Sequence, residues 1–104
     1  MDKRGAYEIA AKYIDSIRPK YHITQAFLFG SYAKGTFHDD SDIDIAIIVE
    51  NVEDIIDAQI DMMKLRRKID LRIEPHPIMK DDFDYDDPLS NEILKYGIII
   101  HNIV

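Results

Sequence analysis

The sequence predicts an α/β (α+β) fold: a single domain over residues 1–104 with a mixed four-stranded sheet packed with helices. Two observations carry this prediction. Two apolar stretches flank a glycine-containing loop, and stretches of helical periodicity separate the strand-like ones, so that the order reads αβ(loop)βαβαβ. With 104 residues and 46% hydrophobic side chains, the chain is able to bury one core.

The first half of the chain begins with a predicted helix over residues 3–18, which has one apolar face and ends at Pro19. Residues 19–25 are expected to be a connector, and residues 26–29 a short strand buried on both faces. In the loop that follows, Ser31 is expected to cap a short helical turn. A second strand over residues 42–49 alternates its side chains, and this alternation places on one face Asp42, Asp44, Ala46 and Ile48.

The second half begins with a predicted helix over residues 51–68, capped by Asn51 and with its apolar stripe along Ile56, Ile60 and Met63. A third strand is expected over residues 69–74, because two prolines follow it. The elements expected after it are a solvated acidic loop over 81–87, a helix over 88–96 with Gly97 as its C-cap, and a last strand over 98–104. His76, between the two prolines, is expected to be a surface or turn residue.

Charge and composition exclude several classes of protein. The formal net charge of −7 argues against gripping nucleic acid through its phosphates, so no direct nucleic-acid binding is expected. The same charge suits divalent cations or a basic partner. The absence of cysteine excludes disulfides and thiolate metal sites. No apolar run approaches the roughly 18 residues of a membrane span, and no signal-like core is present, so a soluble, cytoplasmic protein is expected.

Gly30 and Ser31 predict a phosphate-binding turn. A strand that ends in glycine and opens into a turn exposes backbone N–H groups, and glycine lets a phosphate come close. The Ser31 hydroxyl adds a donor and Lys34 a positive charge. Gly35 has the glycine spacing of a P-loop relative to Gly30, but Thr36 stands where that motif requires lysine.

Asp42 and Asp44 are the stronger signal. Two neighbouring carboxylates repel each other unless a cation lies between them, and Mg²⁺ prefers such oxygen ligands together with substrate phosphates. A two-metal site needs a third carboxylate from a neighbouring strand. Asp70 is the choice, with Glu74 as the fallback if the strand runs in the opposite direction, and Arg72 is expected to pair with an aspartate or to bridge Asp70 and Glu74.

Taken together, Gly30-Ser31, Asp42-Ile43-Asp44 and the later Lys68-Ile69-Asp70-Leu71-Arg72 resemble the signature of the DNA polymerase beta-like nucleotidyltransferase superfamily, and the short chain resembles its minimal nucleotidyltransferases. The resemblance implies transfer of AMP from ATP to a hydroxyl with two Mg²⁺ ions. Asp42, Asp44 and Asp70 would be catalytic metal ligands. The nucleotide-binding residues would be Gly30, Ser31, Lys34 and Ser41.

Minimal nucleotidyltransferases of this kind resemble the antitoxins of two-gene toxin–antitoxin systems, whose partners are helical HEPN-domain ribonucleases. The resemblance implies adenylylation of a toxin tyrosine, with a homodimer or a hetero-oligomer with the toxin as possible assemblies. Three alternatives stay open: an antitoxin that acts by binding alone, a small-molecule adenylyltransferase, and a phosphatase with an aspartate nucleophile. The last is disfavoured because the carboxylate pair opens its strand instead of following one.

Overall fold

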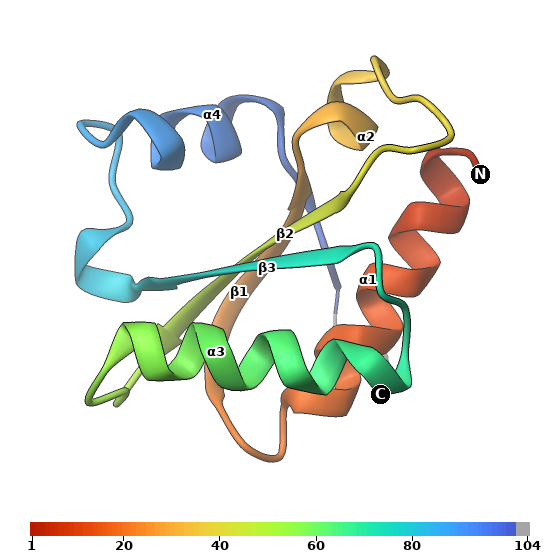
Figure 1. The fold of residues 1–104 in the computed structure, drawn as a ribbon. Helices are drawn as coiled ribbons and strands as arrows, with labels where there is room; N and C mark the ends of the chain where they lie inside the picture. The colour runs from red at the N-terminus through yellow and green to blue at the C-terminus, as the bar shows by residue number, and fades with distance from the viewer. Residues whose placement is uncertain (102–104) are drawn as a thin grey trace.

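The computed structural model describes residues 1–101, in which four strands form one mixed sheet of order β3-β2-β1-β4 (Figure 1). Strand β1 pairs antiparallel with β2 and β4, and β2 pairs parallel with β3. The predicted mixed four-stranded sheet is therefore confirmed. The elements are α1 (Lys3–Ile17), β1 (His22–Phe29), α2 (Ser31–Lys34), β2 (Ile43–Glu50), α3 (Ile55–Leu65), η1 (Arg66–Lys68), β3 (Ile73–Met79), η2 (Lys80–Asp82), α4 (Pro88–Tyr96) and β4 (Ile98–Ile99).

Alternation along β2 divides the core into two layers. Ile43, Ile45 and Ile47 lie in the larger cluster, together with side chains of α1 and Met62 of α3. Ala46 and Ile48 lie in a smaller cluster with phenylalanines of β1 and a side chain of α4. Helices α1 and α3 thus cover one face of the sheet and α4 the other (Figure 1). The predicted alternation of β2 is confirmed, and it puts Asp44 on the α4 face.

Two boundaries in the first half differ from the prediction. Strand β1 begins at His22, because the segment expected to be a connector pairs with the end of β2, from His22 opposite Glu50 onwards. This part of the strand is largely exposed and polar, so it carries no apolar signal. The helical turn α2 is present, but its N-cap is Gly30 and not Ser31.

Helix α3 starts later than expected and buries a different face. Its N-cap is Asp54, whose side chain accepts hydrogen bonds from two backbone N–H groups, whereas Asn51 adopts a left-handed φ of 59° before the helix. The buried residues are Ala58 and Met62, while Ile56 and Ile60 of the predicted stripe are 66% and 52% exposed. The predicted buried stripe is therefore wrong.

Strand β3 was predicted over residues 69–74 but spans Ile73–Met79 and contains both prolines. Proline cannot donate to a strand ladder and is confined to edge strands, and β3 is the edge of this sheet. The two prolines do not stop the strand; they lie at alternate positions, opposite Ile45 and Ile47 of β2. They also discourage further strands from pairing at this edge.

Helix α4 is present over Pro88–Tyr96 as predicted, with Asp87 as its N-cap. Its Ile93 is fully buried, whereas Leu89 is 37% exposed. The Gly97 N–H donates to the Ile93 carbonyl at 2.8 Å, and a Cβ on Gly97 would lie 2.4 Å from that oxygen. The last predicted strand is observed only at Ile98–Ile99, and its residues 102–104 lie outside the described residues. Within residues 1–101, no helix is long and apolar enough to cross a membrane.

Candidate active site

Gly30 lies directly against the Asp44 carboxylate. Gly30 directly follows β1, whose last residue, Phe29, is opposite Asp44, and it adopts φ 71° and ψ −148°. This backbone conformation is essentially restricted to glycine. A Cβ on Gly30 would lie 2.3 Å from Asp44 Oδ2, far closer than real atoms approach. The predicted phosphate-binding turn and the predicted carboxylate are therefore brought together by the β1–β2 pairing.

His76 is the second neighbour of Asp44 and was not among the predicted site residues. Its Nε2 lies 3.2 Å from Asp44 Oδ1. A carboxylate only accepts hydrogen bonds, so Nε2–H is the donor. The imidazole also packs edge-on against Phe29, with ring centroids 5.0 Å apart. The prediction that His76 is a surface or turn residue is wrong, because β3 continues through Pro75 and carries His76 onto the face of Asp44.

Glu74 is the β3 residue directly opposite Asp44. Because paired residues in register point to the same face of a sheet, Glu74, Asp44 and His76 share the α4 face. Asp70 instead lies in the turn between η1 and β3. Both of its carboxylate oxygens bind Arg72, at 3.0 Å from Nε and 2.7 Å from the terminal Nη2, and this hydrogen bonding lowers the pKa of Asp70. The structure confirms the expected pairing of Arg72 with an aspartate, but it does not align Asp70 with Asp44.

Three other predicted site residues make different contacts. Asp42 is exposed and directly precedes β2. The Ser41 hydroxyl accepts a hydrogen bond from the His38 backbone N–H at 2.7 Å, so it closes the loop before Asp42. The Lys34 ammonium binds Glu92 of α4 and lies 5.3 Å from the centre of the Tyr96 ring. The hydrogen bond with Glu92 raises the pKa of Lys34, which is held towards α4.

The oxygen donors suit a hard cation such as Mg²⁺, which usually takes one or two carboxylates and completes its shell with water and substrate phosphates. Among the described residues, no group of three or more His, Asp or Glu side chains is arranged so that it could hold a metal ion. The Asp44 carboxylate nevertheless packs against Gly30, in the space that a Cβ would need. The residues present therefore fit a metal whose remaining ligands come from the nucleotide.

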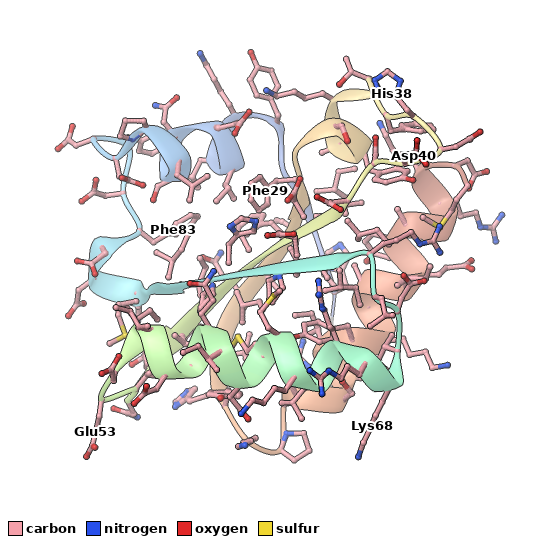
Figure 2. The ribbon with its side chains drawn as sticks, in the orientation of Figure 1. Phe29, His38, Asp40, Glu53, Lys68 and Phe83 are labelled. Carbon is pink, nitrogen blue, oxygen red and sulfur yellow. The ribbon has the colours of Figure 1, made fainter. Side chains whose placement is uncertain are left out.

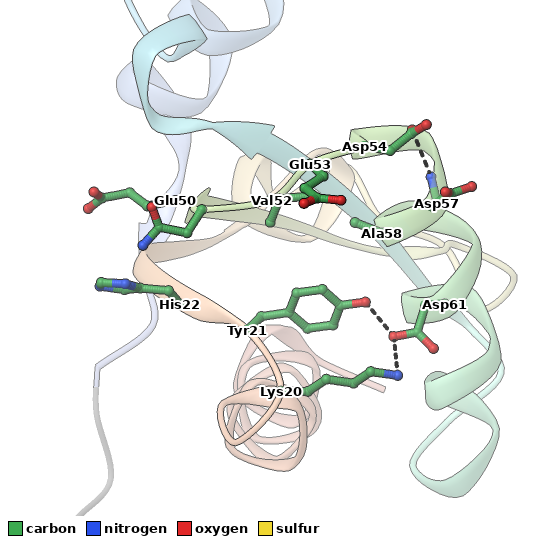
Figure 3. Close-up of a pocket in the computed structure, with 11 residues that line it drawn as sticks. Lys20, Tyr21, His22, Glu50, Val52, Glu53, Asp54, Asp57, Ala58 and Asp61 are labelled. Atoms are coloured by element: carbon green, nitrogen blue, oxygen red, sulfur yellow. Dashed lines mark hydrogen bonds and ion pairs between the residues drawn. The ribbon is translucent and has the colours of Figure 1, made fainter.

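A hollow in the described part of the chain lies elsewhere. It has a volume of about 620 Å³ and is formed by the start of β1, the end of β2 and the start of α3 (Figure 3). Its lining includes Glu50, Glu53, Asp54, Asp57 and Asp61, and Asp61 is bound by Tyr21 and Lys20. Such an acidic wall repels a triphosphate, and no glycine turn reaches it. The candidate active site is therefore the Gly30–Asp44 end of the strands, at the opposite end of the β1–β2 ladder.

A mixed sheet with a glycine turn against a carboxylate defines a class of nucleotide-handling domain. The model of the family described as Polymerase beta, Nucleotidyltransferase matches residues 12–103, and the chain belongs to this family. "Putative protein adenylyltransferase MJ0604" of Methanocaldococcus jannaschii is 31% identical over 96 residues, which cover 89% of this chain and 66% of that protein.

Solved structures of toxin–antitoxin pairs have the same fold. A chain from a toxin–antitoxin complex with AMP-PNP is 26% identical at a TM-score of 0.63, and the match covers 93% of this chain and 73% of that one. A chain from a mutant of the toxin–antitoxin pair MntA–HpeT is also 26% identical, at a TM-score of 0.62, with 88% of this chain and 71% of that one covered. The predicted family and fold are thereby confirmed.

Proposed function

We propose that this chain is a metal-dependent adenylyltransferase that transfers AMP from ATP to a hydroxyl and acts as an antitoxin. The observation that carries the proposal is the contact between the Gly30 backbone and the Asp44 carboxylate, since phosphate binding and metal binding need to be adjacent in nucleotidyl transfer. The similarity to a named protein adenylyltransferase and to toxin–antitoxin structures supports the reaction and the role.

The turn after β1 binds the triphosphate in this proposal. The first backbone N–H groups of a helix lack intrahelical partners, and α2 starts at Ser31, directly after Gly30. Gly30 provides the close approach and the Ser31 hydroxyl adds a donor. Lys34 contributes positive charge once it leaves Glu92, which holds it towards α4. Ser41 supports the site indirectly, by closing the loop that carries Asp42.

Asp42, Asp44 and Glu74 are the proposed metal ligands, with Glu74 in place of Asp70 because only Glu74 lies in register with Asp44. When bound, Mg²⁺ supplies charge neutralisation on the triphosphate and activation of the acceptor hydroxyl. His76 orients Asp44 by donating from Nε2, and Phe29 holds the imidazole ring. Losing Asp44 or Glu74 should therefore abolish transfer, while losing His76 should reduce it.

The proposed acceptor is a tyrosine of a HEPN ribonuclease toxin. The acidic surface of this chain, with its net charge of −7, complements a basic protein that handles RNA. The 620 Å³ hollow is not lined by Gly30 or Asp44, and we expect the acceptor to arrive on another protein. Adenylylation of the toxin would then block its ribonuclease site.

The test is transfer of radiolabel from α-labelled ATP, with Mg²⁺, to the proposed HEPN toxin co-expressed with this chain. We expect label on that partner, an AMP mass on a tyrosine by mass spectrometry, and no label with Asp44→Asn. Absence of label with the intact protein, together with neutralisation of the toxin by Asp44→Asn, would replace the proposal by an antitoxin that acts through binding alone. Label on a small molecule instead of the partner would favour a small-molecule adenylyltransferase.

A further inference from the structure

Helix α3 carries two apolar stripes, and only one of them is used by the fold. Ala58 and Met62 are buried against the sheet. On the opposite side, Ile56 and Ile60 are one helical turn apart and are 66% and 52% exposed, with the half-buried Met63 beside them. Neighbouring exposed apolar side chains on one helix face mark a candidate contact surface for another protein.

The charges along this exposed stripe change sign from one end of the helix to the other. Glu53 and Asp57 lie at its start, and Lys64 and Arg67 lie at its end, with η1 continuing the helix. Figure 2 labels Glu53 and Lys68 at the two opposite ends. None of these four charged side chains has an ion-pair partner within residues 1–101. The stripe is therefore flanked by an acidic end and a basic end, both open to an outside partner.

This charge pattern is self-complementary in an antiparallel pair of α3 helices. In an antiparallel pair centred on Ile60, Ile60 meets Ile60 of the second copy, and Ile56 meets Met63. Asp57 and Lys64 are almost equally distant from the centre, three and four residues away, so each lies opposite the other on the second copy. A two-fold interface repeats every contact, so one matched pair becomes two.

We propose that the exposed face of α3, defined by Ile56, Asp57, Ile60, Met63 and Lys64, is a homodimer interface in which two copies pack antiparallel. The face lies on the α3 side of the sheet, and the candidate active site lies on the α4 side. The dimer therefore leaves the active site of each copy open to other proteins. This proposal does not depend on the proposed function.

The expected dimer is weak. Helix α3 and η1 together span only 14 residues, which corresponds to a length of roughly 20 Å. A helix pair of that length falls below the roughly 1,200–2,000 Å² of standard interfaces. Each copy also carries a net charge of −7, so general repulsion opposes association unless salt screens it. We therefore expect a micromolar dimer at physiological ionic strength.

Sedimentation velocity over a concentration series from about 1 to 500 µM, which spans the micromolar range, tests the proposal. We expect Ile60→Lys to raise the dimer dissociation constant at least about tenfold, since it puts two like charges at the centre of the interface. Leu71→Lys is the matched control, because Leu71 is also 66% exposed but lies outside α3. It should leave the dissociation constant unchanged.

Charge reversal then tests the antiparallel register. Asp57→Lys gives a chain with lysine at both positions, and Lys64→Asp gives a chain with aspartate at both, so each alone should dimerise more weakly than the native chain. An equimolar mixture should form the heterodimer, because both pairs are then matched. A chain that stays monomeric throughout, a dimer insensitive to Ile60→Lys, or a mixture no stronger than its components would overturn the proposal. So would a monomer that uses this face only to bind the toxin.

Discussion

Replacing Gly30 by alanine tests the contact that defines the candidate active site. The new Cβ would lie 2.3 Å from Asp44 Oδ2, so the carboxylate has to move by about 1 Å to reach an ordinary contact distance. That movement breaks the 3.2 Å hydrogen bond between Asp44 and His76. Gly35→Ala is the matched control, because Gly35 also has a positive φ, 79°, but no atom lies within 4 Å of its Cβ position.

The magnitudes separate the two variants. An alanine in the left-handed conformation of Gly35 should lower the free energy of unfolding by about 1–2 kcal/mol. The backbone angles of Gly30 are rarer still for a residue with a Cβ, and an alanine held there costs about 1–3 kcal/mol. The lost Asp44–His76 hydrogen bond adds about 1 kcal/mol. At the centres of these ranges, Gly30→Ala costs about 1.5 kcal/mol more than Gly35→Ala, so its unfolding midpoint should lie roughly 6–12 °C lower.

Thermal unfolding followed by circular dichroism gives the stability difference, and label transfer from α-labelled ATP gives the activity. We expect Gly30→Ala to lose transfer while it remains folded at 20 °C, and Gly35→Ala to retain it. Equal midpoints for the two variants, combined with retained transfer by Gly30→Ala, would refute the contact between the turn and the carboxylate.

Two further predictions concern other side-chain hydrogen bonds. His76→Ala should reduce transfer about tenfold or more, because it removes the group that orients a metal ligand. His76→Gln keeps a hydrogen-bond donor and should retain more activity. Equal rates for both variants in single-turnover assays would contradict the orienting role. Tyr21→Phe removes the hydroxyl that binds Asp61 and should lower the free energy of unfolding by about 1 kcal/mol. This hydrogen bond lowers the pKa of Asp61. Its contribution to the free energy of unfolding is therefore present above the ordinary carboxyl pKa and is lost as the pH falls through the lower pKa of the folded state. Urea unfolding should show that Tyr21→Phe loses less stability than the native chain below about pH 4. An unchanged acid dependence in the variant would contradict it.

The site could be predicted from sequence where the local pattern decides the structure. In β2, strict alternation around Asp44 fixes which face the carboxylate takes, and the structure agrees. The adjacency of Gly30 and Asp44 follows once β1 and β2 pair antiparallel across a loop, because the end of one strand then meets the start of the other. These features depend on short-range periodicity and need no knowledge of distant contacts.

The third strand could not be placed in the same way, because edge position is a property of the whole sheet. Local sequence predicts that a strand stops before Pro75 and Pro77. An edge strand tolerates prolines, and β3 therefore shifts to run through both, from Ile73 to Met79. The shift replaces Asp70 by Glu74 opposite Asp44 and brings His76 onto the same face. The Pro-His-Pro pattern, with alternate prolines, was the one available sign of such an edge strand.

Helix α3 shows a second limit. Ile56, Ile60 and Met63 form as regular a stripe as the buried residues do, so periodicity alone does not say which stripe faces the sheet. Packing decides it. Residues that satisfy helical periodicity and yet remain exposed are informative in their own right, and here they mark the proposed dimer face.

The most direct test of the central claim compares Glu74→Gln with Asp70→Asn in label transfer from α-labelled ATP to the toxin. Both substitutions remove one negative charge and keep the side-chain shape. The register of β3 against β2 predicts that Glu74→Gln abolishes transfer and that Asp70→Asn, which loses only its pairing with Arg72, retains most of it. Full transfer by Glu74→Gln with none by Asp70→Asn would contradict the account.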